Sequence, residues 1–373
     1  MLKALALIAL LQVPAPTQEL APDTRYDPSI PTLSAVAGHD FRAEITPPAQ
    51  VVEYMEALAA SSDRAELIWT GETWEGRPTV MLVRSRRTSS VSLTRGGLLT
   101  TKPRSSSQVF RSFRRWCTAC TETKSAPAGP RWRRPTISSP PKGTRRSTLS
   151  CPSRWSSDGR ARFVMQNAMG RARWEDDEPA SAEHDEPWPG GRVNHYLFDL
   201  NRDWFAQSQP ETRGRVKALL DFMPHVVVDL HEMGGNSTYY FPPNAIPGNT
   251  WTTEEQRALN DIFGAANASK FDERGFAYFN RDTYDAFYPG YGVSWPMAQG
   301  AIGATYEQAS ARGLVLMRTD GDQLTYGDGV LHHFTAAIQT MATAAEHRER
   351  ILQSFVDFRA SAVALGASGN REY

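Results

Sequence analysis

The chain has 373 residues, of which 40% are hydrophobic and 22% are charged. These proportions are ordinary for a globular protein, and the length suits one large α/β domain or two smaller ones. The 41 Lys and Arg residues balance 41 Asp and Glu residues, and this zero net charge argues against nucleic acid as a partner.

The N-terminus has the pattern of a secretory signal peptide. Lys3 precedes an unbroken apolar run from Ala4 to Leu11, and Pro and small residues follow. The run is too short to span a bilayer, and no other stretch reaches membrane length. We therefore expect residues 1–18 to be a signal peptide and the mature protein to be secreted or periplasmic, with no membrane span. The alternative is a buried N-terminal helix.

Residues 34–83 have the pattern of ordinary folded protein. Apolar side chains at helical spacing predict a helix over Pro47–Ala60. Two strands are expected over Glu66–Trp69 and Thr79–Val83, on either side of a turn at 71–77.

The composition changes sharply at Arg84 and recovers at Asp158. Between Arg84 and Ser157 there are 17 Lys and Arg residues against a single acid, Glu122, and there is no His, Asp, Asn, Tyr or Met. Neither a helical nor a strand period of apolar residues persists there. We therefore treat residues 84–157 as anomalous and do not expect them to be natively folded.

Two interpretations of this segment remain open. One is a basic, disordered insert that binds anions. In this interpretation the aromatic residues among the Arg are also typical of nucleic-acid binding. The pair Cys117-x-x-Cys120 is a weak sign of redox or zinc chemistry. The other, which we favour, is a shift of the coding frame that is later restored. The codons for Trp116 to Lys124, read from the third base, permit Val-His-Gly-Leu-His-Gly-Asp-Glu. That peptide contains a His-x-x-Glu pair of the kind that holds zinc.

After Asp158 helical and strand patterns alternate along the chain. This alternation predicts an α/β fold with a mixed, mostly parallel sheet that is flanked by helices. A capping box is expected at Thr252 and Glu255. The predicted elements are a helix over Pro210–Met223, a buried strand over His225–Leu230, a helix over Thr252–Lys270, a short buried strand over Ala301–Tyr306 and a long amphipathic helix over Phe334–Leu365.

Candidate functional residues follow the two predicted strands. His231 and Glu232 come directly after the first strand, where the sites of open α/β sheets gather. Glu307 closes the second strand in Thr305-Tyr-Glu307. A carboxylate at a buried strand end is costly unless it is paired or functional, so Glu307 is a candidate general base, with a core ion pair as the alternative.

Two further candidates lie before the first strand. Asn201 and Arg202 occupy a loop, and an amide beside a guanidinium suits a planar carboxylate, which Arg binds through two parallel hydrogen bonds. A surface loop with a local salt bridge is the alternative. Arg171 follows Asp158-Gly159, and a cationic side chain of this kind stabilises an oxyanion.

The order of these elements resembles the zinc carboxypeptidase family, of the carboxypeptidase A-like type. The resemblance covers Asp158 to about Leu365, with 34–83 as its start, and so implies a catalytic domain over 34–365 that the anomalous segment interrupts. The motifs in the family's order and at compatible spacing are Asn201-Arg202, Asp229-Leu-His231 and Thr305-Tyr-Glu307.

The resemblance also implies a role for each motif. In the family the Asn-Arg pair holds the terminal carboxylate of the substrate, the late His is the third zinc ligand and the Glu activates water. By resemblance these roles fall to Asn201 and Arg202, to His231 and to Glu307.

Two further roles come from the resemblance alone. Arg171 stands about where the family has its oxyanion arginine. The family's substrate-binding tyrosine, some twenty residues before the Glu, best matches Tyr288, with Tyr284 and Tyr291 as alternatives.

The implied function is that of a zinc-dependent carboxypeptidase, a hydrolase that removes residues from a free C-terminus of a peptide or protein with zinc-activated water and a Glu general base. The family site holds one Zn²⁺. This chain departs from it, because no His lies between His39 and His184 and a catalytic zinc needs three protein ligands. We therefore expect the chain as written to bind zinc poorly and to hydrolyse little. The alternatives are a non-catalytic peptide-binding relative, and a zinc endopeptidase or amidase of the same fold.

Overall fold

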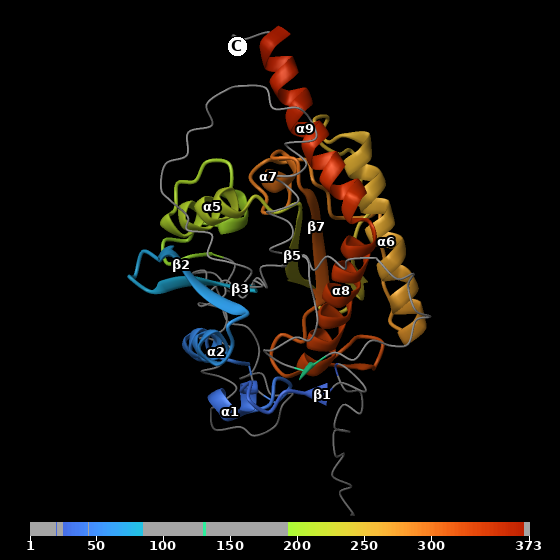
Figure 1. Cartoon of the computed structure of the whole chain (residues 1–373). Coiled ribbons are helices and arrows are strands. Elements are labelled where there is room, and N and C mark those ends of the chain that lie inside the picture. Colours follow the sequence, from blue (N-terminus) through green and yellow to red (C-terminus); the bar gives the residue numbers. More distant parts are fainter. Residues whose placement is uncertain (1–19, 21–24, 44, 85–129, 132–192, 369–373) are drawn as a thin grey trace, which may run out of the picture.

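The computed structural model describes residues 20, 25–43, 45–84, 130–131 and 193–368, which are coloured in Figure 1. The expected signal peptide at 1–18 and Arg171 lie outside the described residues. So does nearly all of the anomalous segment 84–157. Among the residues that the structure describes, no helix combines the length and the apolar character needed to cross a membrane.

The N-terminal part of the domain is a helix packed on a hairpin. Helix α1 (Leu33–Ala37) is followed by α2 (Pro48–Ser61), and strands β2 (Ala65–Glu72) and β3 (Pro78–Arg84) pair antiparallel. The predicted helix and both predicted strands are therefore confirmed, with the strands somewhat longer than expected. The buried side chains that join helix and hairpin are Val51, Val52, Met55 and Val80.

Helix α5 (Pro210–Phe222) packs against β2 and ties the hairpin to the rest of the chain (Figure 1). Gly214 makes this close approach possible, because a Cβ there would overlap the carbonyl oxygen of Thr70. The backbone N–H of Trp74 donates to Glu211 at 3.2 Å, and its indole N–H donates to Gln209 at 2.9 Å.

The central sheet has the strand order β5–β7–β6. Strand β5 (Val226–Met233) runs parallel to β7 (Ile302–Ala309), and β6 (Tyr239–Tyr240) pairs antiparallel with β7. The α/β class with a mixed sheet is thus confirmed. Parallel pairing is limited to β5 and β7 among the described strands. The other described ladders, including β1 (Arg25–Tyr26) with β4 (Pro130–Arg131) and β8 (Val315–Met317) with β9 (Gln323–Thr325), are antiparallel.

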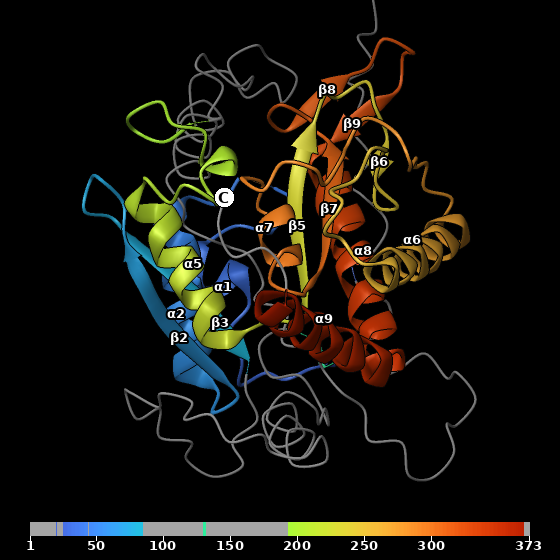
Figure 2. The ribbon, with the colours of Figure 1, turned by 90° about the horizontal axis from the view of Figure 1, so that it is seen from above.

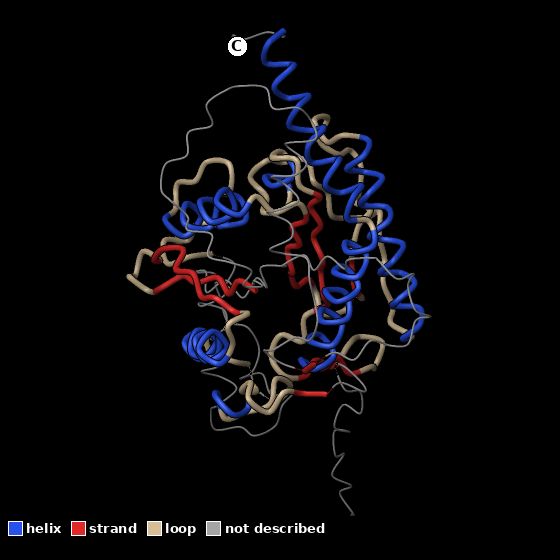
Figure 3. The backbone as a smooth tube through the Cα atoms, in the orientation of Figure 1, coloured by secondary structure: helices blue, strands red, loops and turns tan. Residues whose placement is uncertain are grey.

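Helices α6 (Glu254–Arg274) and α8 (Tyr326–Glu346) cover one face of the sheet, as Figure 2 shows. Phe271 of α6 and Ala336 of α8 pack there against Tyr239 and Tyr306. The short helix α7 (Ser294–Met297) lies on the opposite face, where a Cβ on Gly303 would come within 2.6 Å of Met297. Figure 3 separates the helices and strands of this arrangement by colour.

Two expectations about helix ends were wrong. The capping box of α6 is formed by Thr253 and Gln256, not by Thr252 and Glu255. The reason is tertiary, because the Gln256 amide is buried and also donates to the carbonyls of Met297 and Ala301, both at 2.9 Å.

The expected long helix over Phe334–Leu365 is two helices. Helix α8 already begins at Tyr326, after a capping box of Thr325 and Asp328, and α9 (Arg348–Ser368) follows a break at His347. The break lets Ile351 pack into the cluster that α6 forms with β7. An apolar period alone does not reveal such a change of direction.

We expect Gly214→Ala to destabilise the fold. In a helix interior this change normally stabilises by about 0.5–1 kcal/mol. Here the added methyl group must displace α5 from β2, so a net loss of about 1–3 kcal/mol should appear in urea unfolding. Gly366→Ala in α9 is the matched control, because nothing lies within 4 Å of its Cβ position. Equal effects at both positions would contradict the close packing of α5 on β2.

The stability of the fold should also depend on pH through His225. Burial, and secondarily the charge of Arg348, lower the pKa of His225 from 6.5 to about 4. The unfolded chain therefore binds a proton below pH 6.5 that the folded chain does not bind until about pH 4. The contribution of neutral His225 to the unfolding free energy is therefore complete above pH 6.5. It is lost as the pH falls from 6.5 to 4, and the loss at pH 5 is about 2 kcal/mol.

His225→Phe tests this assignment, because Phe does not titrate and retains an aromatic ring against Phe355. The difference in unfolding free energy between pH 7 and pH 5 should be smaller in the variant by about 2 kcal/mol. An identical pH dependence in both proteins would show that His225 is not the group responsible.

Candidate active site

The register of β5 and β7 places His231 beside Glu307. These residues are directly paired in the parallel ladder, which continues to Met233 and Ala309. Residues paired in a ladder point to the same face of the sheet, and successive residues alternate. Because Tyr306 faces α6 and α8, Glu307 and His231 face the other way. Both candidate residues therefore lie within strands that are longer than predicted, and not beyond the strand ends.

Asp229 holds the imidazole of His231. Its Oδ2 lies 2.8 Å from His231 Nε2, and both side chains are only 9% exposed. A carboxylate only accepts hydrogen bonds, so Nε2 carries the proton and Nδ1 carries the lone pair. Gly292 permits this approach, since a Cβ there would lie 2.6 Å from the same carboxylate oxygen. Asp229 therefore fixes the tautomer and orientation of His231.

Asn201 lies next to this pair and belongs to the 3₁₀ turn η2 (Leu200–Arg202). Asp199 caps the turn, because its side chain accepts from the Asn201 N–H at 2.8 Å. The side-chain Oδ1 of Asn201 accepts from the Gly292 N–H at 2.7 Å. The amide orientation is thereby fixed, and Nδ2 lies 3.4 Å from His231 Nε2. Asn201 therefore presents an N–H₂ donor group to the site.

Arg202 lies against the segment that carries Tyr288 and Tyr291. Its guanidinium is 4.6 Å above the Tyr291 ring, and Nη1 donates to the Asn201 carbonyl at 3.0 Å. The Tyr288 hydroxyl donates to the Arg202 carbonyl at 3.4 Å. The Arg202 side chain is 46% exposed and the nearest carboxylate, that of Asp199, is 3.8 Å away. A held but accessible guanidinium of this kind suits an anionic ligand.

Glu307 is buried next to β6. Tyr240 is the partner of Glu307 in the antiparallel ladder. Burial, and to a smaller extent the negative charge of Glu307, raises the pKa of Tyr240. Tyr240 thus stays protonated and donates its hydroxyl hydrogen to Asn244 at 2.9 Å. The neighbourhood of Glu307 is therefore a low-dielectric one on the sheet face that also carries His231.

His333 and Tyr239 support the site from the opposite face of the sheet, and the sequence analysis did not find them. Burial lowers the pKa of His333 to about 4, so its imidazole is neutral. Its Nε2–H donates to the carbonyl of His231 at 3.0 Å, and its Nδ1 accepts from the Tyr239 hydroxyl at 2.9 Å. The available signal was a polar pair, His332-His333, directly before the helix predicted over Phe334–Leu365.

The structure brings together five of the six site residues expected from the sequence. Asn201 contacts His231, His231 is paired with Glu307, and Arg202 contacts Tyr288. Of the alternative tyrosines, Tyr291 lies under Arg202 and Tyr284 packs on Tyr240. The sixth residue, Arg171, lies outside the described residues.

The described residues do not by themselves fit a catalytic zinc. Within the described residues 25–43, 45–84 and 193–368 there is no group of three His, Cys, Asp or Glu side chains that could hold a metal ion. His231 alone supplies an oriented imidazole lone pair, whereas a catalytic zinc requires three protein ligands.

The chain is similar to solved structures but not to known families or curated proteins by sequence. No protein-family model and no curated protein sequence matches it. Solved structures similar to it include a metallo-carboxypeptidase from Burkholderia cenocepacia, at 13% identity over 81% of this chain and 69% of that chain, with a TM-score of 0.43. A metallo-carboxypeptidase from Pseudomonas aeruginosa in complex with (2-guanidinoethylmercapto)succinic acid matches at 12% identity over 81% and 68%, also at 0.43.

Carboxypeptidase A from Helicoverpa armigera is a further similar structure, at 13% identity over 89% of this chain and 76% of that chain, with a TM-score of 0.40. Two of these three similar structures are thus described as metallo-carboxypeptidases and the third as a carboxypeptidase A.

Proposed function

We propose that this site binds the C-terminal carboxylate of a peptide or protein, as part of a catalytic domain of the zinc carboxypeptidase type. One observation carries the proposal. The Asn201–Arg202 turn is fixed against the 288–292 segment and lies next to His231, so residues from distant parts of the chain form one site. The proposal assigns carboxylate binding to Asn201, Arg202 and Tyr288.

The chemistry of the three side chains supports carboxylate binding. Arg202 offers a planar fork of N–H groups, which matches the two oxygens of a carboxylate. Asn201 adds a directed amide donor because its oxygen is already engaged by Gly292. Tyr288 is 43% exposed and lies next to Arg202, where its hydroxyl can reach a bound peptide.

For hydrolysis, we propose that Glu307 accepts the proton of the attacking water and passes it to the leaving amine. Arg171 is proposed to stabilise the oxyanion. A zinc ion, if a complete site held one, would make a bound water more acidic. His231 is proposed as one of its ligands, and the remaining two are proposed to be encoded in the shifted frame of Trp116–Lys124.

A non-catalytic peptide-binding role is the second candidate for the chain as written. It is favoured by the lack of a three-ligand group in the described part of the chain, together with the intact Asn201–Arg202 turn. Both candidates share the carboxylate site. We further propose that the protein acts outside the cytoplasm, secreted or periplasmic, on the basis of the signal pattern at 1–18.

Carboxylate binding predicts that Arg202→Gln weakens the affinity for a fluorescein-labelled pentapeptide by about tenfold or more, because a charge-assisted pair is lost. Fluorescence anisotropy measures this directly. Arg350→Gln is the matched control, since that side chain is 44% exposed but pairs with Glu255 between α9 and α6. The same peptide with an amidated C-terminus should bind the wild-type protein as weakly as the free peptide binds the Arg202 variant. Equal binding of free and amidated peptides would refute the assignment.

The metal content of the purified chain should be well below one zinc per molecule, as measured by inductively coupled plasma mass spectrometry. The physical reason is that the described part of the chain offers no two further ligands beside His231. Stoichiometric zinc together with chelator-sensitive release of C-terminal residues would overturn this expectation.

Sequencing the gene across codons 84–157 tests the frame shift, and a shifted frame without His-x-x-Glu would rule it out.

A further inference from the structure

We propose that an exposed apolar patch, formed by Ile246, Trp251 and Phe287, docks the protein onto the surface of a zwitterionic lipid bilayer. The three side chains are 91%, 72% and 51% exposed. Two of them belong to the loop between β6 and α6, and the third belongs to the segment before α7. The inference concerns a surface outside the proposed carboxylate site and does not depend on that function.

Hydrogen bonds bring the loop and the segment together. The N–H of Ala245 donates to the carbonyl of Tyr284 at 2.8 Å. The side-chain Nδ2 of Asn249 donates to the carbonyl of Phe287 at 3.0 Å, and Asn249 Oδ1 accepts from the N–H of Trp251 at 2.9 Å. One amide side chain therefore joins the backbones that carry two of the exposed aromatic rings.

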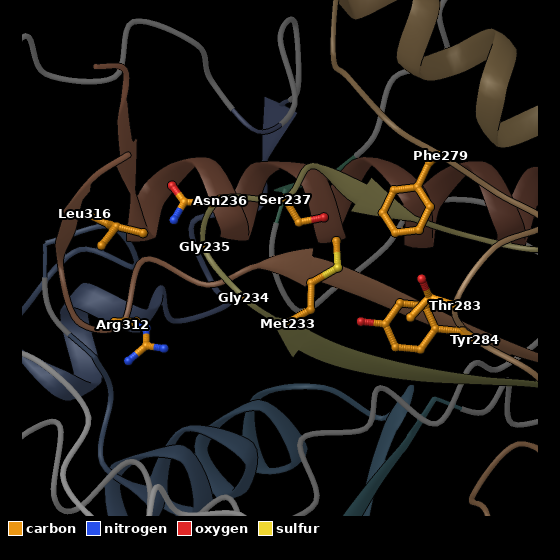
Figure 4. Close-up of a pocket in the computed structure, with 10 residues that line it drawn as sticks. All are labelled: Met233, Gly234, Gly235, Asn236, Ser237, Phe279, Thr283, Tyr284, Arg312 and Leu316. Atoms are coloured by element: carbon orange, nitrogen blue, oxygen red, sulfur yellow. The ribbon is translucent and has the colours of Figure 1, made fainter. Parts of the chain in front are cut away.

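The segments that carry the patch are anchored to the sheet. The hydroxyl of Tyr240 in β6 donates to Asn244 at 2.9 Å, and the ring of Tyr284 packs at 4.8 Å from the ring of Tyr240. Figure 4 shows Tyr284 beside Phe279 in the lining of a cavity of about 670 Å³, and no residue of the apolar patch lines this cavity. The patch is therefore held in place from below, and docking costs little conformational entropy.

The patch lies where two uncharged stretches of the sequence meet. Residues 233–253 and 286–306 contain no Lys, Arg, Asp, Glu or His. The charged residues that directly flank these stretches beside the patch are both acids, Glu254 and Asp285. A partner recognised by its charge finds no complementary group within the patch, and the two flanking carboxylates oppose an anionic surface. The partner that fits is therefore apolar at the point of contact and carries no net negative charge.

The chemistry of the side chains favours a lipid interface over a protein. Ile246 is 91% exposed, so a protein partner would have to supply a matching groove, whereas a fluid bilayer surface adapts to a protruding side chain. Trp is typical of the headgroup region, because its ring is apolar and its indole N–H remains hydrogen-bonded there. Apolar side chains next to it enter the boundary of the acyl chains. A zwitterionic bilayer therefore satisfies both the shape and the charge of the patch.

Binding to lipid vesicles tests the inference. The probes are large unilamellar vesicles of pure phosphatidylcholine, which are mixed with the purified chain and separated by flotation. We expect reversible binding with a partition coefficient on the order of 10⁴ M⁻¹, similar to that of a single myristoyl chain. The 17 Lys and Arg residues of the segment 84–157 attract anionic lipid independently of the patch, so zwitterionic vesicles are the decisive probe.

Two variants locate the effect. Ile246→Gln and Trp251→Gln should each lower the partition coefficient by about fivefold or more, because less apolar surface leaves water on docking. Trp69→Gln is the matched control, since Trp69 is also exposed, at 58%, but belongs to strand β2. The control should bind vesicles like the wild-type protein. The apolar run at 4–11 is identical in all of these proteins and cannot account for a difference between them.

Two further readouts exclude an indirect effect on folding. Phosphatidylcholine should shift the Trp fluorescence to shorter wavelengths in the wild-type protein and in Trp69→Gln, but not in Trp251→Gln. Neither Ile246 nor Trp251 belongs to the proposed carboxylate site, so both variants should bind the labelled pentapeptide with the affinity of the wild-type protein. Urea unfolding should also be unchanged in them, because exposed side chains contribute little to stability.

Each outcome decides for or against the patch. A wild-type protein that does not bind phosphatidylcholine vesicles overturns the inference, and so does binding that both patch variants retain. A dimer in analytical ultracentrifugation that Ile246→Gln abolishes, without vesicle binding, would assign the patch to a contact between two copies of the chain. Vesicle binding that both variants weaken, with peptide affinity unchanged, supports the inference whatever the carboxylate experiment shows.

Discussion

The parallel pairing of β5 with β7 is the constraint on which the site depends. In a parallel ladder directly paired residues share a face, so the register that joins Val226 to Ile302 also joins His231 to Glu307. A slip of one residue would turn one of the two side chains into the apolar core under α6 and α8. The packing of Tyr306 against that core therefore fixes the orientation of Glu307 as well.

Polar contacts then orient the side chains that the register of β5 and β7 places on one face of the sheet. Asp229 sets the tautomer of His231 on the open face, and His333 holds its backbone carbonyl from the buried face. Asn201 is aligned by the backbone of Gly292, a position where any side chain would collide with Asp229. Such hydrogen-bonded networks restrict the geometry of a site. The proposed carboxylate site rests on this framework.

Much of the fold could be predicted from local patterns. The helices at 48–61 and 210–222 and the paired strands β2 and β3 follow the expected apolar periods. The α6 capping box and the division of the C-terminal helix could not be predicted. Gln256 is selected by carbonyl acceptors far along the chain, and the break at His347 is selected by the packing of Ile351. Both depend on partners that a sequence period does not specify.

The sequence by itself determined the α/β class, because strand and helix patterns alternate along the chain. Through its resemblance to a family's order of motifs it also named Asn201-Arg202, His231 and Glu307 as candidate site residues. Only the tertiary structure decided how they meet. The contact between Asn201 and His231 spans 30 residues, and the one between His333 and His231 spans 102. Contacts of this kind arise from strand register and sheet packing, which bring together residues whose relation is invisible along the chain.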